Sequence, residues 1–238
     1  MVHDKFLLRL GAWSGLIYIS VFGLGWLVLA RFFPPIAPSA SAAEVAEIYA
    51  NNHWAMAIAG VAMMVSTVML LPLSALVVLL VAKIEGGPGL LTLMMGFNSA
   101  TFMVLNFYTG LAFNAAAFRV ERPAEIVQAF NDLGFLQFIG GTPMFLAIWG
   151  ILAYAILVTQ PRHGVEVFPR WVGFVNVLVV VLYLPEVLIY LLKTGPFAWD
   201  GLIGFWIPAG LLIGYLVASP FVLTTAVDRA FGNDAAAF

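Results

Sequence analysis

The stretch WAMAIAGVAMMVSTVMLLPLSALVVLLVA, residues 54–82, contains no charged side chain and decides the class of fold. A helix needs about 20 mainly apolar residues to cross the hydrocarbon core of a bilayer, and this stretch exceeds that length. Five further stretches have the same character: Leu10–Ala30, Pro88–Phe118, Phe135–Thr159, Trp171–Leu192 and Gly201–Val227. We therefore predict an all-α, polytopic transmembrane bundle of six spans, forming one domain over residues 1–238.

The composition supports a membrane protein. Hydrophobic residues make up 63% of the 238 residues, charged residues make up 9%, and the mean hydropathy is +1.03. A water-soluble domain would carry about 25% charged residues. The lipid bilayer is therefore the first expected partner. The formal net charge is −2 and no basic patch is present, which argues against a nucleic-acid partner. Cysteine is absent, so disulfides, thiolate metal sites and thiol catalysis are excluded.

Charges that flank the spans predict the orientation. Leu10–Ala30 is longer than the ~7–15-residue core of a signal peptide, so we expect it to be retained as the first span. An even number of spans puts both termini on one side. With that side in the cytoplasm, the inner flanks carry Lys5, Arg9, Lys83, Arg162, Arg170 and Arg229, and the outer flanks carry Arg31, Arg119, Arg122 and Lys193. The inner excess agrees with the positive-inside rule and predicts cytoplasmic termini.

Two outer loops are predicted to contain short helices. The spacing from Ser41 to Glu44 is that of a capping box, and the apolar residues that follow it recur on one helical face. The segment Pro123–Leu133 has a similar apolar stripe, with Gly134 as its expected stop. Both helices could shield the ends of the spans, or they could form a lid over an outer cavity.

Glycine pairs predict close contacts between helices. Gly11 and Gly15, and Gly210 and Gly214, have the four-residue spacing that lets two membrane helices approach each other closely. Such pairs are expected to support packing within the chain at least as well as dimerisation.

Glu186 is the one carboxylate predicted to lie inside a span. A charge in hydrocarbon costs at least ~2.5 kcal/mol on insertion scales, so this side chain is expected to face the bundle interior. Arg119, Arg122 and Arg31 are its candidate partners at the outer side. Glu186 could form a structural ion pair that fastens the fifth span, or it could be a substrate or proton site.

The third span is the most polar. Asn98, Asn106 and Thr109, with Ser99 nearby, fall within roughly a third of the helix circumference, and Asn114 lies at the edge of this arc. Buried asparagines must be hydrogen-bonded, so this face is expected to meet other helices or water. Interhelical hydrogen bonding is one interpretation. The other is the polar wall of a ligand cavity that opens outward near Asn114 and Arg119.

No motif predicts a catalytic or metal site. The histidines, His3, His53 and His163, are isolated and lie outside the middle of the spans, so neither a metal ion nor a haem is expected and no cofactor is predicted. No nucleophile elbow, phosphate-binding loop or zinc-binding helix motif occurs, so enzymatic activity stays uncertain and a non-enzyme is favoured.

Four segments together resemble a group of uncharacterised bacterial membrane proteins with six predicted helices. These segments are Phe168–Phe174, Lys193–Trp199, Phe118–Arg122 and Asn131–Leu133. The resemblance implies the architecture and a bacterial plasma membrane as the location. It implies no activity and assigns no functional residue.

Three classes of function are open at this point. The favoured one is binding or carrying a hydrophobic small molecule or lipid in an outer-half cavity near Glu186. The second is an accessory or assembly subunit of a larger membrane complex, with another membrane protein or a second copy of the chain as partner. The third is a metal-independent membrane enzyme acting on an apolar substrate, with Glu186 as its acid or base.

Overall fold

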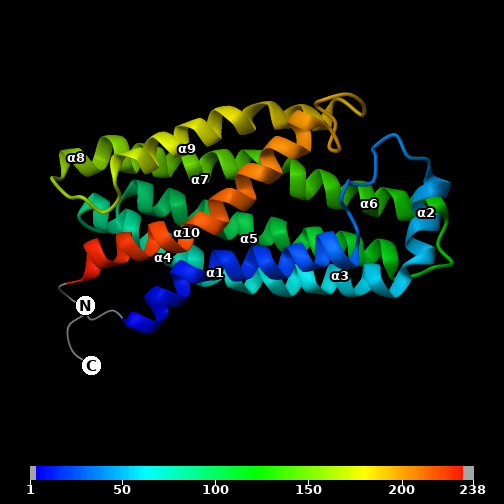
Figure 1. Cartoon of the computed structure of the whole chain (residues 1–238), viewed down its shortest axis with the longest axis horizontal. Coiled ribbons are helices and arrows are strands. Elements are labelled where there is room, and N and C mark those ends of the chain that lie inside the picture. The colour runs from blue at the N-terminus through cyan, green and yellow to red at the C-terminus, as the bar shows by residue number, and fades with distance from the viewer. Residues whose placement is uncertain (1–3, 233–238) are drawn as a thin grey trace.

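The computed structural model describes residues 4–232, which form helices and contain no strand. Figure 1 shows long helices that run along one common axis. Within the described residues, six helical segments are long and apolar enough to cross a membrane: Lys5–Leu29, His53–Glu85, Leu90–Ala117, Ala124–Arg162, Arg170–Tyr190 and Leu202–Phe231. The prediction of an all-α, polytopic bundle is confirmed, and the protein is a multi-pass membrane protein.

Most spans combine α-helix with shorter turns of other helical types. The α-helices are α1 (Lys5–Gly23), α2 (Ala42–Asn51), α3 (His53–Ser66), α4 (Leu70–Glu85), α5 (Leu90–Ala117), α6 (Ala124–Phe138), α7 (Thr142–Tyr154), α8 (Gln160–Arg162), α9 (Arg170–Tyr183) and α10 (Ile207–Phe231). Turns of 3₁₀-helix lie at Thr67–Met69, Ile139–Gly141 and Leu184–Tyr190, and π-helical turns lie at Leu24–Leu29, Ala155–Thr159 and Leu202–Trp206.

Prolines explain several of these irregular turns. Pro143 and Pro208 each stand two residues after the end of such a turn, and Pro185 lies inside one. Proline has no N–H to donate, and its ring collides with the carbonyl four residues earlier in an α-helix. The chain therefore leaves the α-helical geometry at or just before these three prolines.

The two described ends of the chain lie at the same end of the bundle. α1 begins and α10 ends at the left of Figure 1, where α8 also lies, and α2 lies at the right. We call these the terminal end and the α2 end. An even number of spans requires this arrangement. The assignment of the terminal end to the cytoplasm stays a prediction.

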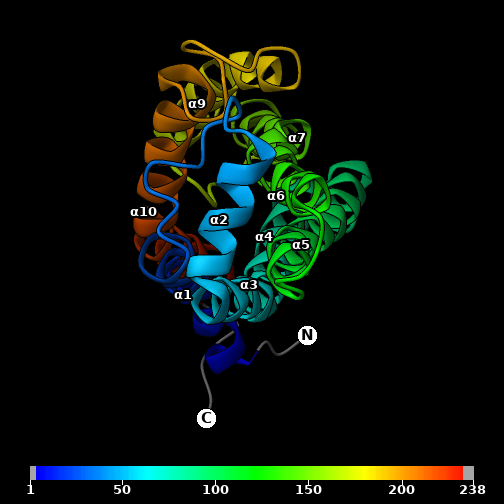
Figure 2. The same cartoon turned by 90° about the vertical axis from the view of Figure 1, so that its right-hand side faces the viewer.

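The predicted capping box is present at the start of α2. The Ser41 hydroxyl accepts a hydrogen bond from the Glu44 amide at 3.3 Å, and the Glu44 carboxylate accepts one from the Ser41 amide at 2.7 Å. These bonds lower the pKa of Glu44. Val45 and Tyr49 are buried, and the Tyr49 hydroxyl donates to Asn131 Oδ1 of α6 at 3.1 Å. α2 thus lies across the α2 end of the bundle (Figure 2).

The prediction of a separate surface helix over Pro123–Leu133 is wrong. α6 runs past Gly134 to Phe138, and one 3₁₀ turn joins it to α7, so a single span extends from Ala124 to Arg162. Gly134 does not stop the helix. A Cβ at this position would lie 2.5 Å from the Phe113 ring of α5, so the glycine lets α6 lie directly against α5.

α3 and α5 approach each other even more closely. A Cβ on Gly110 would lie 2.6 Å from the carbonyl oxygen of Gly60, and a Cβ on Gly60 would lie 2.8 Å from the carbonyl oxygen of Gly110. The Asn114 side chain donates to the Ala57 carbonyl at 2.9 Å beside this crossing. The two helices are thus in backbone contact, which only glycine allows.

A cluster of aromatic rings fills the interior toward the α2 end. Trp26 is at its centre, and its ring centroid lies 5.4 Å from that of Phe32, 5.7 Å from Phe113, 5.6 Å from Phe135 and 5.0 Å from Phe138. The indole N–H donates to the Phe32 carbonyl at 2.8 Å, so the polar atom of the buried ring is satisfied.

Candidate functional site

The asparagines of the third span each bind a different neighbouring helix. Asn98 donates to the Met144 carbonyl of α7 at 3.0 Å. Asn106 Oδ1 accepts from the Tyr18 hydroxyl of α1 at 2.6 Å, and Asn114 bonds to α3. Asn98 and Asn114 are separated by about 24 Å along the helix axis at 1.5 Å per residue, so they cannot share one site. The asparagines therefore tie α5 to three helices.

Thr109 adds no partner from another helix. Its hydroxyl donates to the Leu105 carbonyl of its own helix at 3.0 Å. None of Asn98, Asn106, Thr109 and Asn114 lines the internal cavity described below, whereas Ser99 does. The structure thus bears out hydrogen bonding between helices, and a ligand-binding role for these four residues stays a prediction.

Glu186 points into the bundle, as predicted. It lies on the 3₁₀ turn Leu184–Tyr190, and only 3% of its surface is exposed. Its Oε2 lies 2.7 Å from the hydroxyl of Thr142, at the start of α7. The Thr142 hydroxyl also lies 3.2 Å from the Ile139 carbonyl. Glu186 therefore fastens the end of the fifth span to the fourth.

The predicted arginine partners of Glu186 are wrong. Arg119 pairs with Glu121 at 3.7 Å, and Arg122 donates to the Ala115 carbonyl at 2.6 Å. Arg31 is exposed in the loop after the first span. No ion pair among residues 4–232 includes Glu186. Bringing an arginine from the exposed end of the bundle to the buried Glu186 would cost the desolvation of its charge.

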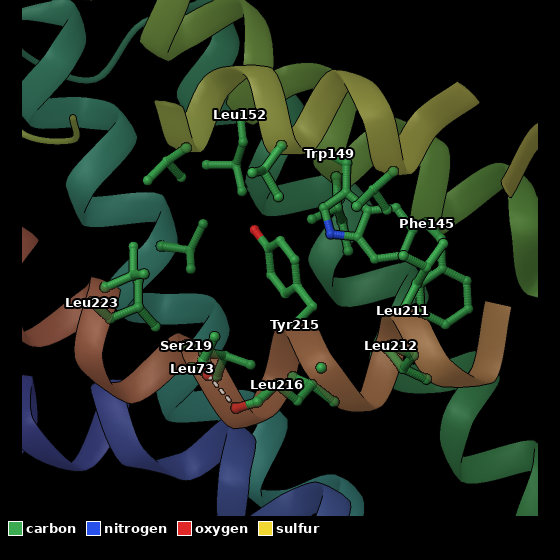
Figure 3. Close-up of a pocket in the computed structure, with 18 of the residues that line it drawn as sticks. Leu73, Phe145, Trp149, Leu152, Leu211, Leu212, Tyr215, Leu216, Ser219 and Leu223 are labelled. Carbon is green, nitrogen blue, oxygen red and sulfur yellow. Dashed lines mark hydrogen bonds between the residues drawn. The ribbon is translucent and has the colours of Figure 1, made fainter. Parts of the chain in front are cut away.

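The bundle contains a cavity of about 330 Å³. Its lining residues, part of which Figure 3 shows, come mainly from α4, α5, α7, α9 and α10 and include Tyr18 of α1. On α5 and α9 it is lined by residues near the terminal end of each helix, including Met95, Ser99 and Val172. It is therefore distinct from the aromatic cluster around Trp26.

The wall of the cavity is almost entirely hydrocarbon and aromatic. No charged side chain occurs among the described residues that line it. The polar lining consists of the hydroxyl groups of Tyr18, Ser74, Ser99, Tyr215 and Ser219 and two indole rings. Such a surface suits a neutral, hydrophobic molecule, because a charged one would be desolvated without a partner.

Two hydroxyl groups of the cavity have no hydrogen-bond partner within residues 4–232. Ser219 donates to the Leu216 carbonyl at 2.8 Å, and the Tyr18 hydroxyl is bonded to Asn106. In contrast, no hydrogen bond among the described residues involves the hydroxyl of Ser74 or Ser99. Ser99 is only 5% exposed and lines the cavity. The Ser99 hydroxyl, at the wall of the cavity, is therefore free to bond to a ligand inside it.

Aromatic side chains form one wall of the cavity. The centroid of the Trp149 ring lies 4.6 Å from that of Tyr183 and 5.7 Å from that of Tyr215. Figure 3 shows the Tyr215 ring between α10 and the side chains of Trp149 and Leu152. The Tyr215 hydroxyl lies 3.2 Å from Asn176 Oδ1 of α9, so this residue connects α10 to α9 beside the cavity.

Gln160 positions the segment that enters α9. Its Oε1 accepts hydrogen bonds from the amides of Val167 and Phe168, each at 2.9 Å, and its Nε2 donates to the Phe168 carbonyl at 2.7 Å. Phe168 lines the cavity, and Trp171 follows it. One buried amide therefore fixes the terminal-end wall of the cavity.

Sequence reasoning missed this cavity and placed a cavity near Glu186 instead. Glu186 is not among the residues that line this cavity, and a second cavity beside the proposed acid or base stays a prediction. The described residues hold no group of three His, Cys, Asp or Glu side chains that could bind a metal ion; the prediction of no metal site stays a prediction. In the sequence, the apolar lining residues cannot be told from core or lipid-facing residues. Only polar lining residues such as Ser74, Ser99 and Tyr215 could have indicated a cavity.

The chain matches no protein-family model, no curated protein and no solved structure. The resemblance to bacterial six-helix membrane proteins therefore stays a prediction, and function has to be argued from the geometry of the cavity.

Proposed function

We propose that the protein binds a neutral hydrophobic small molecule or lipid chain in the cavity lined by α4, α5, α7, α9 and α10. The observation that supports it best is the combination of an uncharged wall with a Ser99 hydroxyl that lines the cavity and has no hydrogen-bond partner among the described residues. A volume of about 330 Å³ lies at the lower end of the range for small-molecule sites, ~300–1,000 Å³. The hydrocarbon wall binds the apolar part, and Ser99 donates to an oxygen of the ligand.

Photolabelling in proteoliposomes tests this proposal. The probe is an eight-carbon alkanol that carries a diazirine, because it is neutral, apolar and able to accept a hydrogen bond. After irradiation, mass spectrometry maps the modified residues. We expect adducts on the lining residues Trp149 and Tyr215, in addition to adducts on exposed residues such as Phe97. Excess unlabelled octanol should suppress the first set more strongly than the second.

Variants that fill the cavity sharpen the test. Ser99→Leu adds hydrocarbon to the cavity without breaking a hydrogen bond, and it should reduce the adducts on Trp149 and Tyr215 while those on Phe97 persist. Thr101→Leu is the matched control, since Thr101 lies on the exposed side of the same helix. Ser74→Leu provides a second filling variant if Ser99→Leu fails to fold. Adducts confined to lipid-facing residues, or unchanged by both filling variants, would contradict the proposal.

A further inference from the structure

The cavity has its mouth between α9 and α10. Most of its lining residues are buried or half-buried. Those that are exposed all belong to these two helices: Trp171 and Val175 on α9, and Gly210, Gly214 and Ala218 on α10. In Figure 1, α10 crosses the bundle obliquely and separates from α9 toward the terminal end. The mouth therefore faces sideways, into the region occupied by lipid chains.

Gly210 and Gly214 keep this mouth open. A Cβ added to either residue would meet no atom within 4 Å. The other glycine pair behaves differently, because a Cβ on Gly11 would lie 2.8 Å from Leu76 Cβ and one on Gly15 would lie 3.1 Å from Ser219 Oγ. The predicted close helix contact is thus found at Gly11 and Gly15. At Gly210 and Gly214 the same spacing leaves a gap.

Two hydrogen bonds and one ion pair join α9 and the loop before it to α10 around this gap. The Tyr183 hydroxyl donates to the Pro208 carbonyl at 2.7 Å and joins the end of α9 to the start of α10. Tyr215, the residue after Gly214, donates its hydroxyl to Asn176 Oδ1 at 3.2 Å. Arg229, near the end of α10, pairs with Glu166 at 2.9 Å in the loop before α9. The Tyr183–Pro208 bond and the Arg229–Glu166 pair lie on either side of the exposed lining residues along the two helices, and the Tyr215–Asn176 bond lies next to Gly214 and Val175.

We propose that the ligand enters and leaves the cavity sideways from the hydrocarbon of the bilayer, through the gap between α9 and α10. This inference rests on the proposed function, because it assumes that the cavity takes up a ligand. Small side chains on one lip and apolar side chains on the other let a chain or flat ring pass without meeting a charge. Ser99, a buried residue whose hydroxyl has no hydrogen-bond partner among the described residues, marks the inner end of the route.

The route selects the class of ligand. None of the five exposed residues at the mouth, Trp171, Val175, Gly210, Gly214 and Ala218, is charged, so an ionic headgroup would have no partner there. A neutral lipophile with one terminal oxygen, such as a long-chain alcohol, ester or ketone, can pass the mouth and accept a hydrogen bond from Ser99. We expect phospholipid headgroups to stay outside.

The absence of native cysteine allows a direct test of this route. Ser99→Cys introduces one thiol at the inner end of the cavity and breaks no hydrogen bond with a described residue. Its reaction with N-alkylmaleimides is followed by mass spectrometry in proteoliposomes. The rate should increase from the ethyl to the hexyl reagent, as the reagent concentrates in the bilayer. A charged, membrane-impermeant maleimide should not react.

Closing the mouth should slow the reaction. Adding Gly214→Leu to Ser99→Cys should lower the rate about tenfold or more, which corresponds to a barrier higher by ~1.4 kcal/mol. Gly210→Leu should act in the same direction. Gly96→Leu is the matched control, because a Cβ on Gly96 also meets no atom within 4 Å but this residue does not line the cavity. Its rate should equal that of Ser99→Cys alone.

The outcomes separate this inference from the proposed function. A thiol that reacts with no reagent means that the cavity is closed and would overturn both. A thiol that reacts equally fast with and without Gly214→Leu and Gly210→Leu means that the cavity is accessible by another route, which overturns the lateral route alone. Reaction with the impermeant reagent would show an aqueous route and have the same consequence.

Discussion

The contact between α3 and α5 and the gap between α9 and α10 use the same residue type for opposite purposes. Gly60 and Gly110 bring two backbones together, whereas Gly210 and Gly214 face space beside a cavity. Both sets lie on apolar helices within spans. The difference teaches that a glycine in a membrane helix indicates where something approaches the backbone, which is a helix in one case and, we propose, a ligand in the other.

The largest effect is expected where the backbones touch. Gly110→Ala places a Cβ 2.6 Å from the Gly60 carbonyl, which cannot move without displacing α3. We expect it to destabilise the protein by ~3 kcal/mol, at the upper end of the usual cost of overpacking. Thermal unfolding in detergent, followed by circular dichroism, measures it. Gly96→Ala on the same helix is the control and should not destabilise. Equal stability of both variants would show that α3 and α5 are further apart than described.

An intermediate effect is expected at the attachment of the fifth span. Thr142→Val removes the hydroxyl that binds Glu186 and keeps the side-chain shape, so a buried carboxyl group loses its partner. Leaving a buried polar group unsatisfied costs ~1–3 kcal/mol. The free energy of unfolding should fall by that amount, measured by denaturant titration with tryptophan fluorescence. Thr101→Val, at an exposed position, should change it little. A fully stable Thr142→Val would show that this hydrogen bond contributes nothing to stability.

At the gap between α9 and α10 we expect a smaller effect, which increases stability. Gly210→Ala adds a methyl group that meets no atom within 4 Å, and alanine favours a helix interior over glycine by ~0.5–1 kcal/mol. The variant should therefore unfold at a slightly higher temperature than the wild type. Loss of stability instead would show that another helix packs on Gly210, as the glycine spacing predicted.

The smallest effect is expected for Glu186→Gln. With an arginine as partner, this change would have left a buried charge uncompensated. Because the observed partner is the Thr142 hydroxyl, the glutamine amide can keep the hydrogen bond. We expect a loss of ~1 kcal/mol or less, smaller than that of Thr142→Val, because the hydrogen bond to Thr142 is kept. A large loss of stability in the unfolding assay would point to a cationic partner for Glu186. Glu186→Leu, which cannot bond to Thr142, is the comparison variant.

The spans were predictable because the hydrophobic runs are long and almost free of charge. Their ends differ from the prediction by a few residues, except where α6 continues into α7. That join was missed because Gly134 was interpreted by its low helix propensity, whereas its position against Phe113 keeps it in the helix. Tertiary packing overrides local propensity in such a case.

The candidate site was less predictable than the fold. The burial of Glu186 and the interhelical bonds of Asn98, Asn106 and Asn114 follow from the cost of unpaired polar groups in hydrocarbon. Which partner each one finds depends on the order of helices around the bundle, and the sequence does not give that order. The cavity escaped notice for the same reason, since a space is defined by the side chains of several helices at once.

The break between α6 and α7 has a consequence for how the spans assemble. The Tyr190 hydroxyl donates to the carbonyl of Gly140 at 2.7 Å, and Gly140 belongs to the 3₁₀ turn that separates the two helices. A carbonyl released from the α-helical pattern has no water to bind inside the hydrocarbon. Before the fifth span arrives, this group would face lipid chains without a donor. We therefore expect the fourth and fifth spans to leave the insertion machinery as a pair. The Tyr190 hydroxyl then gives the Gly140 carbonyl the hydrogen bond that water would give it outside the membrane.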